Sequence, residues 1–194
     1  MLPIDATLIS GRPNLERCSM NAIEITSPIA DDTIAKLKVG QQALLSGIIY
    51  TARDAAHKKL VAAMQSNEDC GFNVAGQTIY YAGPCPAKPG QVIGPVGPTT
   101  SGRMDAYTPY LLDHGLKAMI GKGSRSPEVK RALMQTRAVY FAAIGGAAAV
   151  IMKCVRSVEF VAFDELGTEA VRKLTIERLP LIVALDIYGG DIYA

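Results

Sequence analysis

The sequence lacks the residue spacings that mark metal-binding, secreted or membrane proteins. Its cysteines form no CxxC pair, and a chain of 194 residues folds without disulfides, so we interpret them as reduced thiols that serve in packing. They are Cys18, Cys70, Cys85 and Cys154. Residues 1–19 contain no basic segment followed by an apolar core, so no secretory signal is predicted. The longest apolar run, residues 138–152, is interrupted by two glycines and is too short to cross a membrane.

A large net charge is also lacking. The formal charge is +2, which does not favour nucleic acid as a partner, and a hydrophobic content of 49% excludes wholesale disorder. There is no GxGxxG or P-loop pattern to indicate nucleotide binding, and no internal repeat. Residues 103–137 hold seven basic and three acidic side chains. This excess suits small anions, and a solvated helix face is the commoner explanation.

Alternation of strands and helices through the central region predicts an α/β fold. Strands are expected at 21–25, 41–51, 76–83, 116–120, 138–144, 158–163 and 181–186, the last apolar enough to be central. Helices are expected at 27–37, 52–64, 103–112, 126–135 and from 147. Residues 1–20 show no clear period. We therefore expect an N-terminal extension, 1–20, followed by a single domain, 21–194.

The stretch from Gly97 to Asp105 reads Gly-Pro-Thr-Thr-Ser-Gly-Arg-Met-Asp. Ser, Thr and Asp satisfy the orphan amide donors of a helix N-terminus, and glycine lets the backbone come close to a ligand. With an arginine in the first turn, the pattern indicates a site for a carboxylate or phosphate. An ordinary capped helix start has the same pattern, and spacing alone does not separate the two.

A second informative stretch surrounds Arg53, which follows a predicted strand and enters a predicted helix. Ligands of α/β folds often bind at such a strand end. His57 lies four residues later and so shares one helix face with Arg53. A functional role is open for both residues. For His57 the alternative is a structural role, in which it holds Arg53.

The loop at 83–98 carries five prolines and leads directly into Thr99, and long loops in compact domains are functional or disordered. We favour function.

Four stretches, taken in order, together resemble one known family. They are Ser46–Lys58, Ile79–Pro84, Gly97–Asp105 and Gly121–Gly123. They closely resemble the C-terminal domain, or separate beta subunit, of the class I iron–sulfur fumarases and the related L-tartrate dehydratases. The resemblance covers residues from about Ile25 to Ile192, and the Gly-Pro-Thr-Thr-x-Gly-Arg-Met-Asp run is its most specific part.

The resemblance implies a swivelling β/β/α domain that closes over an active site held mainly by an alpha subunit or N-terminal domain. It implies a hydro-lyase, fumarate hydratase, which adds water reversibly to fumarate to give (S)-malate and is active only with the alpha subunit. In that family three cysteines of the alpha portion hold a four-iron four-sulfur cluster, and no cysteine here matches them. We expect this chain to bind no cluster, and to be dimeric within a cytoplasmic hetero-oligomer.

Residue roles follow from the resemblance position by position. Arg53 and Arg103 would bind substrate carboxylates, and Lys122 would add a further cationic contact. Thr99 would lie beside the carbon that loses its proton and is the candidate base. A hydroxyl is a poor base without strong perturbation, so a cap or a substrate hydrogen-bond donor is the alternative role for Thr99. The expected supporting residues are His57, Thr100 and Asp105.

Two other functions remain open. The beta subunit of an L(+)-tartrate dehydratase, which converts tartrate to oxaloacetate, would use the same motifs. A non-catalytic anion-binding or interaction module could have the same fold, but a purely structural module would need none of Arg53, Thr99, Arg103 and Lys122. Their joint presence favours an enzyme.

Overall fold

The computed structural model describes residues 22–143 and 148–194. The extension expected at 1–20, Cys18 and the Gly145-Gly146 turn lie outside these ranges. One seven-stranded sheet organises the described chain, in the order β1-β2-β3-β4-β5-β7-β6. Its strands are β1 (Ile23–Ser27), β2 (Gln42–Thr51), β3 (Thr78–Tyr80), β4 (Ala118–Gly121), β5 (Val139–Ala142), β6 (Val155–Ala162) and β7 (Val171–Leu185).

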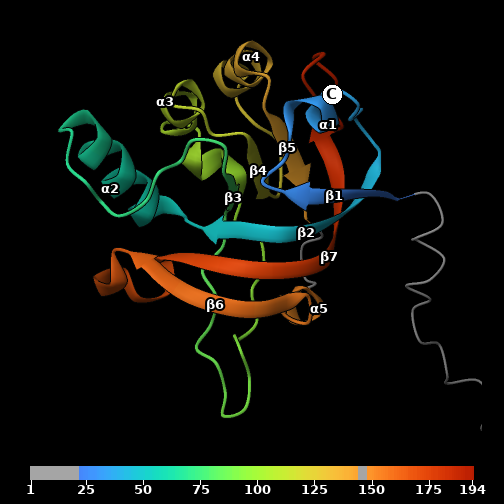
Figure 1. Cartoon of the computed structure of the whole chain (residues 1–194). Helices are drawn as coiled ribbons and strands as arrows, with labels where there is room; N and C mark the ends of the chain where they lie inside the picture. Colours follow the sequence, from blue (N-terminus) through green and yellow to red (C-terminus); the bar gives the residue numbers. More distant parts are fainter. Residues whose placement is uncertain (1–21, 144–147) are drawn as a thin grey trace, which may run out of the picture.

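The sheet closes on itself, because β2 pairs with β7 as well as with β3. Strands β1 to β5 pair in parallel, whereas β7 runs antiparallel to β2, β5 and β6. The pairings therefore form a ring of β2, β3, β4, β5 and β7, with β1 and β6 attached outside it. Figure 1 shows β7 crossing the molecule beneath β2, with β6 beyond it.

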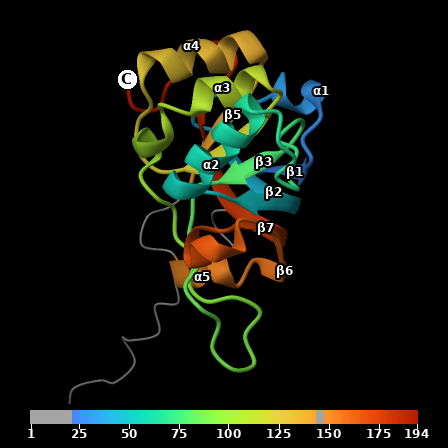
Figure 2. The same cartoon turned by 90° about the vertical axis from the view of Figure 1, so that its left-hand side faces the viewer.

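The helices of the described residues are α1 (Asp31–Ile34), α2 (Asp54–Gln65), α3 (Thr108–Asp113), α4 (Pro127–Thr136) and α5 (Ala148–Met152), with 3₁₀ turns η2 (Ser101–Met104) and η3 (Asp164–Glu169). Helices α2, α3 and α4 cover one side of the parallel strands, as Figures 1 and 2 show. Alternate strand residues separate two apolar cores. Ile79, Met119 and Tyr140 face the cluster that contains α2, α3 and α4. Tyr80, Ile120 and Phe141 face the cluster built with β1, β2 and β7.

Several expected elements are confirmed, among them β2, β3, β4, β5 and α2. Helix α4 begins as predicted, with Pro127 in its first turn and the Ser126 hydroxyl accepting a hydrogen bond from the Val129 amide at 3.3 Å. The mixed α/β class is also confirmed. The proline-rich loop contains no helix or strand, and Figure 1 shows it extending past β6.

Three expectations were wrong in extent. The helix predicted at 27–37 is only Asp31–Ile34, because Ser27 still belongs to β1 and pairs with Gly47. The helix predicted at 103–112 is divided into η2 and α3, and Pro109 lies in the first turn of α3, where its missing amide is tolerated. The last strand begins at Val171 rather than 181, because charged residues along its first half hide it from an apolar pattern.

Candidate active site

The candidate site lies at the carboxyl ends of three neighbouring parallel strands. Arg53 follows β2 and Lys122 follows β4, while the loop that leaves β3 returns to these strand ends. There the amide of Thr99 donates to the carbonyl of Tyr81 at 2.6 Å, and the amide of Ser101 donates to the carbonyl of Lys122 at 2.9 Å. Because parallel strands in an α/β sheet end at one edge, this edge is where ligands bind most often. The predicted motifs are therefore brought together.

Two arginines of the site share one carboxylate. Asp54, the first residue of α2, accepts a hydrogen bond from Arg53 Nε through Oδ2 at 3.3 Å, and its Oδ1 lies 2.7 Å from Arg103 Nε. Partial burial works to raise the pKa of Asp54, but its backbone hydrogen bond and the two guanidinium groups outweigh burial and hold that pKa below its usual value. Asp54 is therefore a carboxylate near neutral pH, and Arg53 and Arg103 are held side by side.

A second carboxylate, Glu169 of η3, holds Arg53 from the other side. Its Oε1 lies 3.4 Å from Arg53 Nη2, and its Oε2 accepts a hydrogen bond from the Ala55 amide at 2.9 Å, at the start of α2. The Arg53 side chain passes over Gly83, where an added Cβ would lie 3.1 Å from Arg53 Cδ and 2.9 Å from the Thr168 carbonyl oxygen. Only glycine fits between Arg53 and η3 at this position.

The hydroxyl-rich turn does not form the expected capped helix. Thr100 occupies the N-cap position of η2, but its side chain makes no capping hydrogen bond. The amides of Arg103 and Asp105 donate to carbonyls of Thr100 and Gly102 at 3.4 and 3.3 Å, and that of Ser101 bonds to Lys122. The predicted anion site built on free backbone amides is therefore wrong for these three groups. The turn still offers the Arg103 guanidinium to an anion.

Thr99 is half-buried beside the end of β3. Among the described residues, no side chain makes a hydrogen bond to its hydroxyl. Thr100 and Lys122, both exposed, pair as an isolated parallel bridge, so Lys122 lies next to the turn. Nothing in these contacts perturbs the Thr99 hydroxyl, and its role as a base remains a prediction.

His57 is fully buried beneath the site. Its backbone amide and its Nδ1 both lie within hydrogen-bonding distance of the Arg53 carbonyl oxygen, at 2.8 and 3.0 Å, and its ring meets the Tyr81 ring edge-on with centroids 5.1 Å apart. Its Nε2 has no hydrogen-bond partner among the described residues. Burial lowers the pKa of His57 to about 4, so the ring is neutral near pH 7. This geometry favours the structural role, in which His57 fixes the backbone that carries Arg53.

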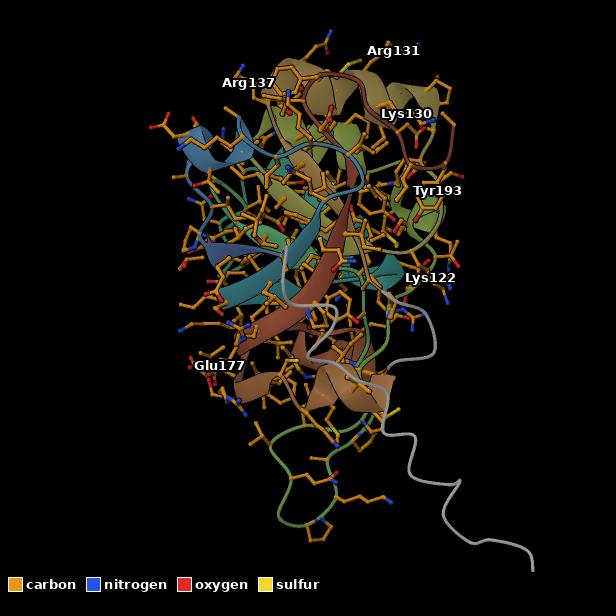
Figure 3. All side chains as sticks on the ribbon, turned by 90° about the vertical axis from the view of Figure 1, so that its right-hand side faces the viewer. Lys122, Lys130, Arg131, Arg137, Glu177 and Tyr193 are labelled. Carbon is orange, nitrogen blue, oxygen red and sulfur yellow. The ribbon has the colours of Figure 1, made fainter. Side chains whose placement is uncertain are left out.

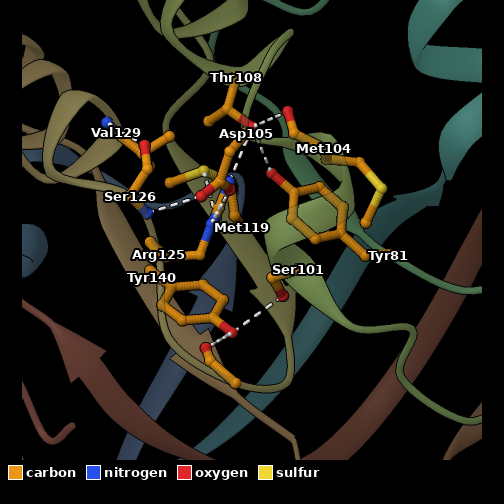
Figure 4. Close-up of polar contacts among 11 residues, drawn as sticks. Tyr81, Ser101, Met104, Asp105, Thr108, Met119, Arg125, Ser126, Val129 and Tyr140 are labelled. Carbon is orange, nitrogen blue, oxygen red and sulfur yellow. Dashed lines mark hydrogen bonds and ion pairs between the residues drawn. The ribbon is translucent and has the colours of Figure 1, made fainter.

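Asp105 belongs to a buried polar network (Figure 4). Its Oδ1 accepts from Arg125 Nε at 2.7 Å and its Oδ2 accepts from the Ser126 amide at 2.6 Å. Arg125, whose side chain is 0% exposed, also donates to Thr108 at 2.8 Å. Asp105 therefore supports the site by tying η2 to the start of α4.

Close packing of the turn onto β4 depends on Gly121. A Cβ at Gly121 would lie 1.9 Å from the Ser101 hydroxyl oxygen. That hydroxyl is within hydrogen-bonding distance of the Tyr140 hydroxyl, at 2.9 Å, and Tyr140 in turn donates to the Gly123 carbonyl at 2.8 Å. Ser101 is therefore an internal contact rather than a ligand-binding hydroxyl.

The basic excess of residues 103–137 does not form one anion patch. Lys130 pairs with Asp191 at 2.5 Å and Lys117 with Asp31 at 2.7 Å, while Arg125 is buried. Figure 3 shows Lys130, Arg131 and Arg137 along α4, apart from Lys122. The α4 helix with its C-cap residue accounts for three of the seven basic residues, and Arg103 and Lys122 are the two that lie at the site.

Sequence reasoning missed Asp54, Glu169 and Arg125 as site-forming residues. Asp54 adjoins Arg53 in the sequence, so the neighbouring charge was a usable clue. Glu169 reaches the start of α2 across 114 residues, and no pattern in the sequence links the two. Arg125 looked like one more surface cation.

Three further sequence predictions concern the cysteines, metal binding and membrane-spanning helices. The described cysteines carry no disulfide, but Cys85 is exposed, so the prediction that each cysteine serves in packing is wrong for Cys85. Within 22–143 and 148–194, no three His, Cys, Asp or Glu side chains gather where they could hold a metal ion. In the same ranges, no helix has the length and apolar character needed to span a bilayer.

Comparison with known proteins gives one consistent family. The family described as Fumarase C-terminus matches residues 6–194. A putative L(+)-tartrate dehydratase subunit beta of Methanocaldococcus jannaschii is 42% identical over 166 residues, which cover 82% of this chain and 85% of that protein. Fumarate hydratase 2 of Leishmania major is 37% identical over 163 residues, which cover 83% of this chain and 29% of that protein.

A third relative, the anaerobic class I fumarate hydratase of Escherichia coli, is 36% identical over 162 residues, 82% of this chain and 30% of that enzyme. The chain thus spans about a third or less of the fumarate hydratases it matches and most of the tartrate dehydratase subunit. Its likeness to the fumarate hydratases concerns one portion of a longer protein.

Proposed function

The chain belongs to the fumarase C-terminal family, and from that premise we propose that it is the beta subunit of a class I iron–sulfur fumarate hydratase. The observation that carries this proposal is the arginine pair, Arg53 and Arg103, held side by side at the carboxyl edge of the parallel strands. Paired guanidinium groups suit a small dicarboxylate, because each offers planar, charge-assisted hydrogen bonds to a carboxylate. The reaction is the reversible trans addition of water to fumarate, giving (S)-malate.

Each proposed role uses a group that lies at this edge. Arg53 and Arg103 bind the substrate carboxylates, and Lys122 adds positive charge from the turn after β4. Thr99 acts as the base from its deprotonated form: its alkoxide takes the proton from the carbon next to a carboxylate when malate loses water and becomes the neutral hydroxyl, which returns that proton in the reverse direction. Loss of that proton places additional negative charge on the carboxylate, and fixed cations stabilise such charge most where water is excluded.

We assign the four-iron four-sulfur cluster to an alpha subunit. We also propose that residues 21–194 form a single swivelling domain that closes over an active site held mainly by the alpha subunit, after an N-terminal extension of residues 1–20. The protein would be dimeric within a hetero-oligomer, in the cytoplasm. The family match and the subunit name of the Methanocaldococcus relative support a split enzyme.

The second candidate is the beta subunit of an L(+)-tartrate dehydratase. It is favoured by the Methanocaldococcus relative, which is the most similar of the three relatives described and is matched over 85% of its length. Tartrate is also a dicarboxylate, so the same arginine pair would bind it. A purely structural module would not require two arginines positioned by internal carboxylates.

Fumarate hydration by the assembled complex tests the proposal. The loss of fumarate absorbance in the ultraviolet is measured for this chain alone and after anaerobic assembly with a cluster-loaded alpha chain. We expect turnover only in the assembled complex. Greater turnover of tartrate than of fumarate would support the second candidate, and no turnover of either acid would contradict both.

A further inference from the structure

Asp54 contacts both arginines through their Nε atoms, while Arg53 also pairs through its terminal Nη2 with Glu169. Arg53 Nε and Arg103 Nε approach the two oxygens of the same Asp54 carboxylate. Among the described residues, the terminal nitrogens of Arg103 have no hydrogen-bond or ion-pair partner. Arg103 is 52% exposed and Arg53 25% exposed, so both remain accessible to a small ligand.

A carboxylate between two arginines can act in two opposite ways. It can fix the distance and orientation of two cations that would otherwise repel each other and sample many rotamers. Alternatively, it can compete for the positive charge that a substrate carboxylate needs. The contact through Nε favours the first, because it leaves the terminal edge of Arg103, which can bind a carboxylate through two hydrogen bonds, available to the ligand.

We propose that Asp54 is a positioning residue that spaces the Arg53 and Arg103 guanidinium groups for the two carboxylates of one dicarboxylate. This inference rests on the proposed function. Asp54 is well placed for the task, because it starts α2 and its carboxylate oxygens each face one guanidinium. Glu169 assists from η3 by pairing with Arg53 alone and by binding the Ala55 amide.

The test compares Asp54→Asn with the wild-type chain in the assembled complex, with Glu165→Gln as the matched control. Asparagine keeps the shape of Asp54 but loses the charge and offers one acceptor oxygen in place of two. Glu165 also lies in η3 and pairs with Lys59 of α2, away from the arginine pair. We expect the KM of Asp54→Asn to rise about tenfold with kcat within about threefold of wild type, the size expected for one lost hydrogen bond to a charged group. Glu165→Gln should leave both constants unchanged.

Two outcomes would overturn the inference. A lower KM in Asp54→Asn would mean that Asp54 competes with substrate. An unchanged KM with lower kcat and a lower melting temperature would mean that Asp54 only stabilises the fold. If Asp54→Asn does not fold, Glu169→Gln replaces it, and a smaller rise of KM in the same direction is expected.

A titration separates this inference from the proposed function. Arginine Nε–H resonances of this chain are followed by NMR as succinate, a saturated dicarboxylate, is added. If the wild-type complex turns over neither fumarate nor tartrate, the proposed function fails, and the titration still tests Asp54. Succinate binding at least about fivefold tighter in wild type than in Asp54→Asn supports the inference. Equal or weaker binding in wild type overturns it.

Discussion

Burial of His57 makes the stability of the fold depend on pH. Above the ordinary pKa of 6.5 the ring is neutral in both the folded and the unfolded chain, so its contribution is fully present. As pH falls from 6.5 towards the folded pKa of about 4, only the unfolded chain takes up the proton. Stability is therefore lost over this window. Arg125 adds to the lowering of this pKa by its charge, and Asp54 opposes it.

The first prediction is that His57→Gln reduces the loss of stability between pH 7 and pH 5 by about 2 kcal/mol, from the shift in pKa between 6.5 and about 4. Urea unfolding at the two pH values measures it. His114 is exposed and stacks on Tyr110, so His114→Gln serves as the control and should leave the pH dependence intact. An unchanged pH dependence in His57→Gln would contradict the account.

A second prediction concerns Gly83, over which Arg53 passes. An added methyl group in Gly83→Ala meets the Thr168 carbonyl at 2.9 Å and the Arg53 side chain at 3.1 Å. We expect displacement of Arg53 and a rise of KM of about tenfold in the assembled complex. Gly90→Ala is the control: its backbone φ of +80° is also strained by a side chain, but no atom lies within 4 Å of a Cβ there, so its KM should stay at the wild-type value. A wild-type KM in Gly83→Ala would show that Arg53 does not need its observed position.

At the residue scale, the sequence indicated which cations belong to the site but not what holds them. Arg53, Arg103 and Lys122 each belong to a short sequence motif, and a short motif can be recognised without knowledge of the fold. The partners of Arg53 combine a neighbour, Asp54, with Glu169 from a distant 3₁₀ turn. Such a pairing depends on tertiary contacts and has no local pattern.

At the scale of elements, the Asp105–Arg125 pair joins η2 to the first turn of α4. Removing one partner of a buried pair leaves the other charge without compensation. We therefore predict that Asp105→Ala lowers the free energy of unfolding by about 3–5 kcal/mol, measured by urea unfolding. Glu128→Gln, which breaks an exposed pair with Arg131 on α4, is the control and should leave the unfolding midpoint unchanged. Equal effects of the two variants would contradict the structural role of Asp105.

A fourth prediction tests the contact between η2 and β4. Gly121→Ala would force a methyl group to within 1.9 Å of the Ser101 hydroxyl oxygen, and we expect a loss of roughly 1–3 kcal/mol of stability from overpacking. Combining it with Ser101→Ala removes the clashing oxygen, so the double variant should be more stable than the sum of the two single changes predicts. Additive losses would mean that the two residues do not press on each other.

Elements with a single period or a clear cap could be predicted from sequence, and others could not. β2 and α4 follow apolar periodicity and a Ser-Pro start. β7 carries Arg172, Lys173 and Glu177 along its first half. This half pairs with β6, and these side chains are partly or fully exposed to solvent. Long strands that cross between environments change their pattern midway and lose the sequence signature of a strand.

For the whole molecule, the closing pairing of β2 with β7 joins segments about 130 residues apart and sets the architecture. Alternation of elements predicted the α/β class, but no sequence period encodes which distant strands pair. The same closure brings η3, just before β7, against α2 and so delivers Glu169 to Arg53. The candidate site therefore depends on the complete fold as well as on the motifs.

The most direct measurement is the turnover of fumarate by the assembled complex carrying Arg103→Gln, compared with Arg131→Gln. Arg131 is an exposed arginine of α4 paired with Glu128, so its variant controls for the loss of one surface cation. We predict that Arg103→Gln lowers kcat/KM about a hundredfold, as expected for losing charge-assisted hydrogen bonds to a carboxylate, while Arg131→Gln keeps wild-type turnover. Equal turnover in the two variants would contradict the assignment of this edge of the sheet as the carboxylate-binding site.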